Sequence, residues 1–335
     1  MPVQTLKIGL IGAGRIGRLH ASHLTSRIPS AELIMVADPF EEAARKCAEQ
    51  WAIPLYRQDY HAVLDHPDIQ AIVICSSTAT HAQIIAEGAQ AGKHIFCEKP
   101  IALDLPAIDR ALESVKRAGV KLQIGFNRRF DTNYRRVRQA VELGEIGQPL
   151  VLHIVSRDPA PPPIAYIRAS GGLFLDMTIH DFDMARHLMG SEVEEVFARA
   201  STICDPTIAE AGDVDNAVVT LQFANGAIGT ISNSRHAAYG YDQRVELLGS
   251  SGAISTANNY PNTAIISDAR SVRRDLPLHF FVERYDESFI AEMVAFVDAV
   301  LCDKPVPVTG QDGRVSVAIA LAAQMSLDEH RPVRL

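Results

Sequence analysis

Two separate segments of the chain carry side chains that could move a proton together. Lys99 stands in the sequence Glu98-Lys99-Pro100, directly after a short apolar strand pattern, and Asp176 and His180 stand four residues apart in a helical pattern. Residues with that spacing share one face of an α-helix. An imidazole titrates near neutral pH, so His180 could act as a general base with Asp176 as its partner. The Lys99 ammonium could donate a hydrogen bond to a reacting oxygen.

The same helical pattern raises the alternative of a metal site. Asp176, His180, Asp183 and His187 follow one another at intervals of four, three and four residues. Ligands from a single helix rarely surround an ion, and neither a cysteine nor a second cluster completes the shell. We therefore expect no metal, and we expect Asp183 and His187 to be structural.

A glycine-rich loop near the N-terminus predicts a dinucleotide site. An apolar run at residues 8–11 precedes the sequence GAGRIG at residues 12–17, and a helical pattern follows. Gly12 permits a tight turn, Gly14 lets the backbone approach a pyrophosphate, and Gly17 lets the helix pack on the strand. The phosphates would then meet the N–H groups and dipole at the helix N-terminus. The predicted contacts in this loop are Gly12, Gly14, Arg15 and Ile16.

Asp38 indicates which dinucleotide is bound. It ends the second strand pattern, about 20 residues past the glycine loop, where a carboxylate would hold the adenosine ribose hydroxyls. A carboxylate repels the 2′-phosphate of NADP, and the next residues, Pro39 and Phe40, cannot neutralise it. We expect NAD rather than NADP, and Arg45 is the residue that could reverse this preference.

Polar residues after the third strand pattern, residues 71–75, should face the same crevice. Ligands of a parallel sheet sit beyond the carboxyl ends of its strands. Ser76, Thr78 and His81 follow this strand, and Glu98 ends a later one, so all four are predicted to contact the cofactor. The small hydroxyl residues could also cap the next helix.

The composition excludes several classes of protein. A chain of 335 residues is long enough for two domains with cores of their own. The net charge of −8 disfavours nucleic acid as a partner, and no apolar run reaches the ~18 residues of a membrane span. The five cysteines are odd in number and lack CxxC spacing, which indicates reduced thiols in a cytoplasmic protein.

The elements that must position these groups fall into two regions. Residues 1–124 alternate strand and helix, which predicts a Rossmann-type parallel sheet covered on both faces. The expected strands are 6–11, 31–37, 71–75, 94–97 and 121–124, and the expected helices are 19–27, 41–50, 80–91 and 105–118.

Residues 125–335 predict an α+β domain with a large, open, mainly antiparallel sheet. Closely spaced strand patterns and the turn at Asn225-Gly226 indicate hairpins. The expected strands begin with one near 151 and continue at 193–203, 214–223, 227–234, 243–249, 252–257 and 263–267, and the expected helices are 132–143, 172–188, 288–302 and 312–325. These helices are too few to cover both sheet faces, so we expect a homo-oligomer, with a tetramer favoured over a dimer. The proline-rich loop 159–163 could frame a substrate or simply connect elements.

Taken together, these motifs resemble the glucose–fructose oxidoreductase / inositol 2-dehydrogenase / rhizopine catabolism (Gfo/Idh/MocA) family over essentially the whole length. The resemblance lies in IGAGRIG, in Glu98-Lys99-Pro100 and in GGLFLDMTIHDFDMAR. It implies an NAD-binding Rossmann domain at residues 1–124 and a substrate-binding and oligomerisation domain at residues 125–335. It also implies that Lys99, Asp176 and His180 are the catalytic residues.

Within the family the chain is most similar to inositol 2-dehydrogenases, through GFNRRFD, SRDP and AYGYDQRVELLG. This resemblance implies NAD-dependent oxidation of a cyclic polyol, myo-inositol to 2-keto-myo-inositol, with a substrate site lined by Asn127, Arg128, Asp158 and Tyr241. Some members carry His and Asn where this chain has Ser156 and Asp158. Another inositol isomer or an aldose therefore stays open as the substrate, as does an NAD-using glycosidase activity. The intact Lys/Asp/His set argues against a non-catalytic sensor.

Overall fold

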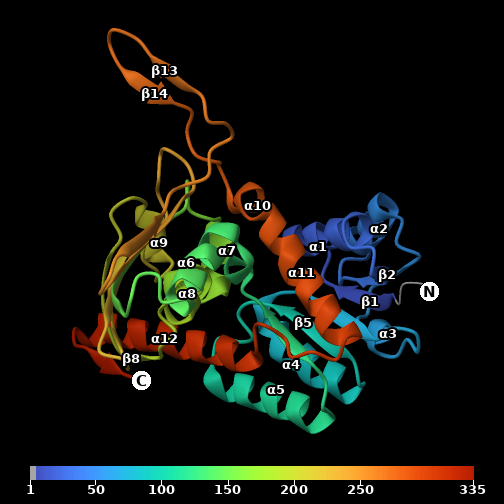
Figure 1. Cartoon of the computed structure of the whole chain (residues 1–335). Coiled ribbons are helices and arrows are strands. Elements are labelled where there is room, and N and C mark those ends of the chain that lie inside the picture. Colours follow the sequence, from blue (N-terminus) through green and yellow to red (C-terminus); the bar gives the residue numbers. More distant parts are fainter. Residues whose placement is uncertain (1–4) are drawn as a thin grey trace. The chain divides into compact units, whose positions relative to one another are not determined.

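A computed structural model describes residues 5–335 and divides them into two compact units (Figure 1). The first unit comprises residues 5–127 and 287–317, and the second comprises residues 128–286 and 318–335. The sequence had placed all of 125–335 in one domain, so the position of 287–317 corrects that division. The reason is burial, because Met293, Phe296 and Val297 of helix α11 (Asp286–Leu301) join the buried cluster of the first unit.

The first unit contains a six-stranded, wholly parallel sheet in the order β3-β2-β1-β4-β5-β6. This order reverses at β1, which has β2 on one side and β4 on the other, and ligands of such sheets bind at that switch point. The Rossmann prediction is therefore confirmed. The strands are β1 (Leu6–Ile11), β2 (Ala31–Ala37), β3 (Leu55–Arg57), β4 (Ala71–Ile74), β5 (His94–Glu98) and β6 (Leu122–Gly125).

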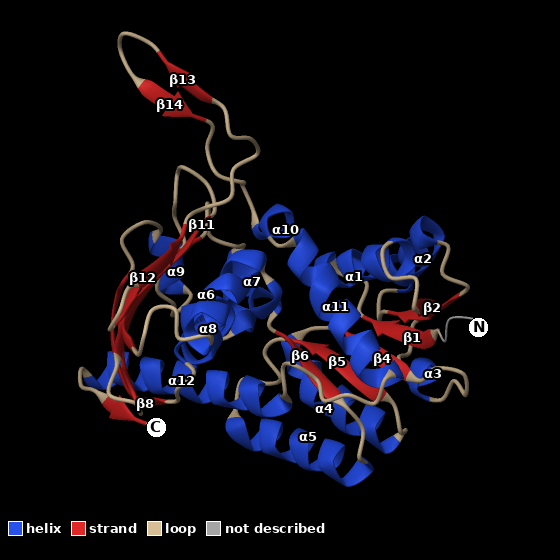
Figure 2. Ribbon diagram, viewed as in Figure 1, coloured by secondary structure: helices blue, strands red, loops and turns tan. Residues whose placement is uncertain are grey.

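Helices cover both faces of this sheet (Figure 2). On one face, the buried cluster joins β1 to residues of α1, α2 and α11. On the other, Gly9 and Gly88 permit close packing, since a Cβ at either would lie within 2.6 Å of the Val63 or Ile72 side chain. Strand β3 and helix α3 are too short to show a periodic pattern and were not predicted. The helices are α1 (Arg15–Ser26), α2 (Glu41–Trp51), α3 (His61–Leu64), α4 (Thr78–Gln90) and α5 (Leu105–Ala118).

The second unit contains a seven-stranded sheet in the order β12-β11-β7-β10-β9-β8-β15. Strands β7 and β10 pair in parallel and the other neighbours are antiparallel, so the sheet is mainly antiparallel, as predicted. The strands are β7 (Pro149–Arg157), β8 (Val193–Ser201), β9 (Asn216–Phe223), β10 (Ile228–Ser234), β11 (Asp242–Gly249), β12 (Ala253–Thr256) and β15 (Val333–Arg334).

The strand predicted at 263–267 lies outside this sheet, which corrects the sequence-based expectation. Strand β13 (Ile265–Ser267) pairs with β14 (Val272–Arg274) in a hairpin that projects from the second unit (Figure 1). Every residue of both strands is exposed. Ile265 and Ile266 are adjacent, so they point to opposite faces and one sheet face could not bury both.

Helices lie on one face of the seven-stranded sheet (Figure 2). The opposite face exposes alternate residues, such as Val218 on β9 and Ile228 on β10. Within residues 5–335, no helix combines the length and the apolarity that crossing a membrane requires. The remaining helices are α6 (Thr132–Glu142), α7 (Ile164–Ser170), α8 (Ile179–Met189), α9 (Pro206–Glu210), α10 (Phe281–Arg284) and α12 (Gly310–Glu329), with a 3-10 helix η1 (Asn127–Phe130) and a π-helix η2 (Phe174–Thr178).

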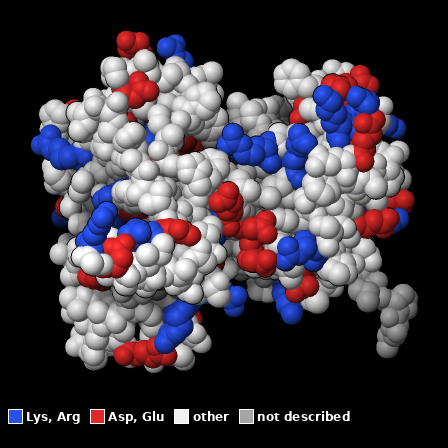
Figure 3. Space-filling model, turned by 90° about the horizontal axis from the view of Figure 1, so that it is seen from above, with Lys and Arg blue, Asp and Glu red and all other residues white. Residues whose placement is uncertain are grey.

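Charged side chains of both signs are interspersed on the face of the molecule in Figure 3. Ion pairs account for part of this pattern. On α2, for example, Arg45 lies between Glu42 and Glu49 and binds both.

Candidate active site

The glycine loop follows β1, at the point where the order of the parallel sheet reverses. Gly12 has a φ of +102°, and a Cβ there would lie 2.6 Å from the backbone of Cys75. A Cβ at Gly17 would lie 1.9 Å from the Gly12 carbonyl oxygen. Both positions therefore require glycine.

Gly14 has the opposite surroundings, because a Cβ there would meet no atom within 4 Å. The backbone is open at this point to a phosphate group. Gly14 is also the N-cap of α1 and has no side chain to cap the helix, so an anion can take that place. Arg15 and Ile16, which were predicted to contact the cofactor, form the first turn of this helix.

Asp38 lies where a ribose-binding carboxylate is expected. Its Oδ2 accepts a hydrogen bond from the Ala13 N–H at 2.8 Å, and its Oδ1 accepts one from the Phe40 N–H at 2.9 Å. Each oxygen keeps a further lone pair for a hydroxyl group. Arg45 is held by Glu42 and Glu49 on α2, so its charge is already paired. These contacts fit NAD.

The loop after β4 is tied to the lysine motif by His81. Its ring is buried, with Nδ1 at 2.8 Å from the Pro100 carbonyl oxygen and Nε2 at 3.0 Å from that of Ser76. Burial lowers the pKa of His81. The hydroxyl of Ser76 lies 2.7 Å from that of Thr80, while the helix N-cap, Ser77, makes no side-chain capping bond. Direct contact of His81, Ser76 or Thr78 with the cofactor stays a prediction.

Lys99 follows the carboxyl end of β5, at the same edge of the sheet as the glycine loop. Lys99 is half-buried, and its peptide bond to Pro100 is cis. The preceding Glu98 accepts a hydrogen bond from His20 Nε2 at 2.8 Å, which connects the motif to α1. The first unit thus brings together the glycine loop, the loop after β4 and the lysine motif.

In the second unit, Asp176 lies in a π-helical turn rather than in the continuous α-helix that was predicted for 172–188. Turns of this kind are frequent at functional sites. The Thr178 side-chain hydroxyl lies 3.3 Å from the carbonyl oxygen of Leu173, five residues earlier, and 2.8 Å from Asn233 Oδ1, and it can donate to either oxygen. The prediction that Asp176 and His180 lie one turn apart on a regular α-helix is therefore wrong. Asp176 lies in the wider π-helical turn, and His180 lies in α8.

The donors to the Asp176 carboxylate include Tyr166 and Arg235. The Tyr166 hydroxyl donates to Oδ1 at 2.9 Å, and Arg235 Nη1 donates to Oδ2 at 3.3 Å. Arg235 is 1% exposed and also binds Asp213 at 3.4 Å. A carboxylate bound in this way is fixed in orientation.

Of the predicted substrate residues, Asp158 interacts electrostatically with this carboxylate. Burial raises the pKa of Asp158 to about 6. The positive charge of Arg235 opposes this rise, and the negative charge of Asp176 adds to it. Burial also raises the pKa of Tyr241, and Arg128 opposes that shift. The second unit therefore brings Arg128, Asp158, Tyr241 and Asp176 into electrostatic contact. Asn127 belongs to the first unit, and its role stays a prediction.

Sequence reasoning missed the buried partners of these residues. Arg128 donates to Asp181 Oδ1 at 2.5 Å, and Asn233 donates to Asp181 Oδ2 at 2.8 Å. One signal was available, because Asn233 and Arg235 are polar at alternate positions where the earlier part of β10 is apolar and buried. Both oxygens of Asp183 accept hydrogen bonds from Arg129, as expected for a structural residue.

The comparisons with known proteins agree with this geometry. Residues 6–126 match the oxidoreductase family with an NAD-binding Rossmann fold, and residues 134–255 match the GFO/IDH/MocA C-terminal domain. The chain is 48% identical to a myo-inositol 2-dehydrogenase of Thermotoga maritima, over 98% of each chain. It is 44% identical to an inositol 2-dehydrogenase of Rhizobium meliloti, over 99% of each.

The chain belongs to the Gfo/Idh/MocA family.

A solved relative bears on the cofactor of this family member. The crystal structure of scyllo-inositol dehydrogenase from Lactobacillus casei with bound NAD(H) and scyllo-inositol has a TM-score of 0.93 to this chain, with 31% identity over 98% of this chain and 99% of that one. The Gfo/Idh/MocA protein described here is an oxidoreductase with NAD as its cofactor. The opening at Gly14 and the spare lone pairs of Asp38 fit this group.

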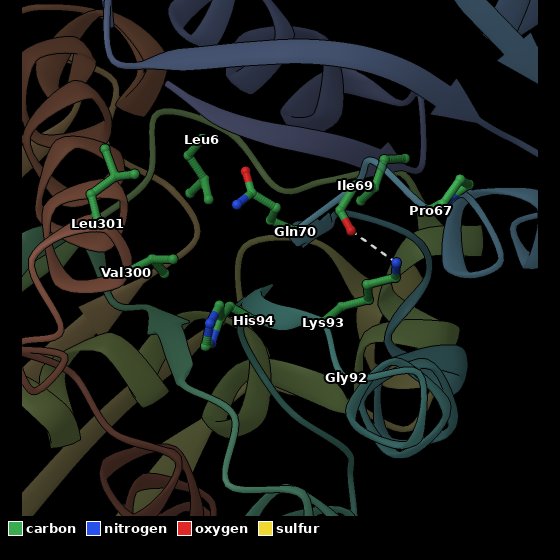
Figure 4. Close-up of a pocket in the computed structure, with 9 residues that line it drawn as sticks. All are labelled: Leu6, Pro67, Ile69, Gln70, Gly92, Lys93, His94, Val300 and Leu301. Carbon is green, nitrogen blue, oxygen red and sulfur yellow. Dashed lines mark hydrogen bonds between the residues drawn. The ribbon is translucent and has the colours of Figure 1, made fainter. Parts of the chain in front are cut away.

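One cavity of the Gfo/Idh/MocA protein lies away from this chemistry. It has a volume of about 420 Å³ and is lined by residues that include Leu6, Gln70 and His94, at the amino ends of β1, β4 and β5 (Figure 4). Lys93 points its ammonium at the Ile69 carbonyl oxygen there, at 2.8 Å. Because ligands of parallel sheets bind at the carboxyl ends, this cavity is not the cofactor crevice.

Proposed function

We propose that the chain is an NAD-dependent inositol 2-dehydrogenase that oxidises the axial hydroxyl of myo-inositol to 2-keto-myo-inositol. The observation that carries the proposal is the end-to-end similarity to a myo-inositol 2-dehydrogenase at 48% identity. The side chains gathered in the second unit support it. A cyclic polyol offers many hydroxyls and no charge, and Arg128, Asp158 and Tyr241 offer donors and acceptors to such hydroxyls.

The chemistry requires removal of a hydride and a proton from one CH–OH group. NAD, when bound, takes the hydride. In the proposal, His180 accepts the hydroxyl proton and later releases it to solvent, while Lys99 donates a hydrogen bond to the oxygen that becomes the carbonyl. Asp176, fixed by Tyr166 and Arg235, orients the imidazole and stabilises its charged form. The proposal therefore requires Lys99 and His180 to meet around a single carbon.

A substrate screen tests this proposal. Purified protein with NAD and a panel of inositols and aldoses should produce NADH, followed by its absorbance, with the highest kcat/KM for myo-inositol. A higher kcat/KM for scyllo-inositol or for an aldose would identify a different substrate. Glycoside cleavage without net formation of NADH would favour the glycosidase alternative.

The catalytic assignment has its own test. Lys99→Met should lower kcat by about 10²–10³-fold while NAD still binds, because one positioned donor to a developing oxyanion contributes that much in rate. Lys116→Met, at an exposed position on α5, is the matched control. Wild-type kcat in Lys99→Met would refute the assignment.

We also propose that the protein is a homotetramer and acts in the cytoplasm. The face of the seven-stranded sheet that lies opposite the helices exposes Val218 and Ile228 by 53% and 52%. The β13–β14 hairpin exposes Ile265 and Ile266, and an isolated two-stranded hairpin is marginally stable in water. A second copy that covers these surfaces would stabilise both. Light scattering should give the mass of four chains, and Val218→Glu should reduce it.

All five cysteines are unpaired, which agrees with a reducing compartment.

A further inference from the structure

A buried carboxylic acid lies behind the lysine motif, on an element that the motif does not include. Glu292 is on α11 and is 0% exposed. Neither of its carboxyl oxygens has a hydrogen-bond partner within residues 5–335. A carboxyl oxygen of Glu292, one of Glu98 and a ring nitrogen of His20 all lie within 4.8 Å of one another. All three residues belong to the first unit, and they come from α11, β5 and α1.

The hydrogen bond between His20 and Glu98 assigns the proton on the ring. A carboxylate only accepts, so His20 Nε2 carries the hydrogen that points to Glu98 Oε1 at 2.8 Å. The ring is 0% exposed and meets Phe96 and Phe289 edge-on, with centroids 5.3 and 5.8 Å away. Its Nδ1 has no partner in the described part of the chain.

This arrangement does not suit a metal ion. The ring nitrogen of His20 that faces the two carboxyl groups, Nε2, carries a hydrogen. It therefore has no lone pair to offer to a metal ion. A metal-bound histidine almost always donates its other ring N–H to a partner, and Nδ1 of His20 has none among residues 5–335. What the three side chains can hold is a proton.

The surroundings of Glu292 keep that proton on its carboxyl group. Burial raises the pKa of Glu292 well above its usual value, and the charge of Glu98 raises it further. Other titratable groups that interact with Glu98 include the thiols of Cys75 and Cys97, whose pKa values burial raises, and the His81 ring, whose pKa burial lowers. On β6, Gln123 donates to the main-chain oxygen of Glu292 at 2.8 Å and not to its carboxyl group. A buried carboxylate with no donor would be costly, whereas a neutral acid is not.

We propose that His20, Glu98 and Glu292 form a buried proton-holding site, in which Glu292 is a neutral acid that donates to the Glu98 carboxylate and thereby positions the lysine motif. The carboxyl oxygens of Glu292 and Glu98 lie within 4.8 Å of each other, so the proposed hydrogen bond requires the Glu292 side chain to rotate toward Glu98. The Glu98 carboxylate then receives one hydrogen bond from each side.

Gly125 on β6 packs against a third side of the Glu98 carboxyl group, since a Cβ at this glycine would lie 3.1 Å from the carboxyl carbon of Glu98. With Glu292 neutral, the negative charge of this pair of carboxyl groups lies on Glu98, next to Lys99. His20 and Glu292 are thus positioning residues, because they act through Glu98.

Infrared spectroscopy tests the proton directly and needs no activity. The difference spectrum of wild type minus Glu292→Gln at pH 8 should show the C=O band of a carboxylic acid. Glu287→Gln, an exposed position on the same helix, is the control and should remove a carboxylate band instead. Loss of a carboxylate band in Glu292→Gln would overturn the proposal, as would a stoichiometric metal in elemental analysis of the untreated protein.

Kinetics test the positioning role, and this part rests on the proposed dehydrogenase function. A glutamine amide can donate to Glu98 as the acid does, so Glu292→Gln should keep kcat within about two-fold and keep the pH profile. Glu292→Leu fills similar space without a donor and should lower kcat by about ten-fold, as expected for one lost hydrogen bond.

Equal losses in the two variants would overturn the positioning role, and so would unchanged kcat in Glu292→Leu. If Glu292→Leu does not fold, the infrared spectrum of the glutamine variant still tests whether Glu292 holds a proton. If wild type oxidises no polyol, the proposed function fails while the infrared result stands by itself.

Discussion

Replacing Asp158 with asparagine should stabilise the protein at neutral pH and leave its stability unchanged at low pH. Burial raises the pKa of Asp158 from 3.8 to about 6. The folded state therefore holds a proton that the unfolded state releases near pH 4. Stability is lost as pH rises between these values, because an ionised Asp158 is disfavoured only when folded. The neutral amide of asparagine has no such pH dependence.

The magnitude follows from the size of the shift. A difference of about two pKa units is worth about 3 kcal/mol over the full transition, since one unit is worth ~1.4 kcal/mol. Between pH 5 and pH 8 the linkage relation gives about 1.4 kcal/mol, because much of Asp158 has already ionised in the unfolded state at pH 5. The free energy of unfolding of Asp158→Asn minus that of wild type should therefore grow by about 1.4 kcal/mol across this range.

Urea unfolding at several pH values between 5 and 8 measures this difference. Glu210→Gln, at an exposed position at the end of α9 in the same unit, is the control and should track wild type at every pH. A constant difference between Asp158→Asn and wild type from pH 5 to pH 8 would refute the reasoning. It would mean that Asp158 is not desolvated in the folded protein.

Three further outcomes are expected. Asp38→Ala should raise KM for NAD by about ten-fold or more in steady-state assays, since the ribose hydroxyls lose an acceptor and the Ala13 N–H loses its partner; an unchanged KM would contradict the assignment. Arg284→Leu should lower the free energy of unfolding by about 3–5 kcal/mol, because Asp131 keeps a buried charge without its cation. A loss below ~1 kcal/mol in urea unfolding would show that this pair is solvated. His180→Ala should lower kcat at pH 7 by about 10²–10⁴-fold, with recovery at alkaline pH as hydroxide replaces the base; a flat pH–rate profile close to wild type would exclude His180 as the base.

Much of the fold followed from local patterns. Five of the six strands of the first unit match their predicted ranges within about a residue, because a strand covered on both faces is apolar throughout. The segment 287–317 was placed in the wrong unit, since an amphipathic helix does not specify which surface buries it. The strand at 263–267 was found as an element and misplaced, because pairing depends on a partner distant in sequence.

The proposed catalytic residues and the loops that carry them could be found from the sequence, because each motif depends mainly on its own backbone. Gly12 is required by its own positive φ and Gly17 by a contact within the same turn, and Lys99 is placed by the strand that it follows.

Only the tertiary structure determined which charged residues lie beside these site residues. Arg235 reaches Asp176 across 59 residues, and Glu292 approaches Glu98 from a helix almost two hundred residues further on. Burial explains such pairs, because a polar group removed from water is costly unless it finds another polar partner. Local sequence spacing does not specify which distant residue that partner is.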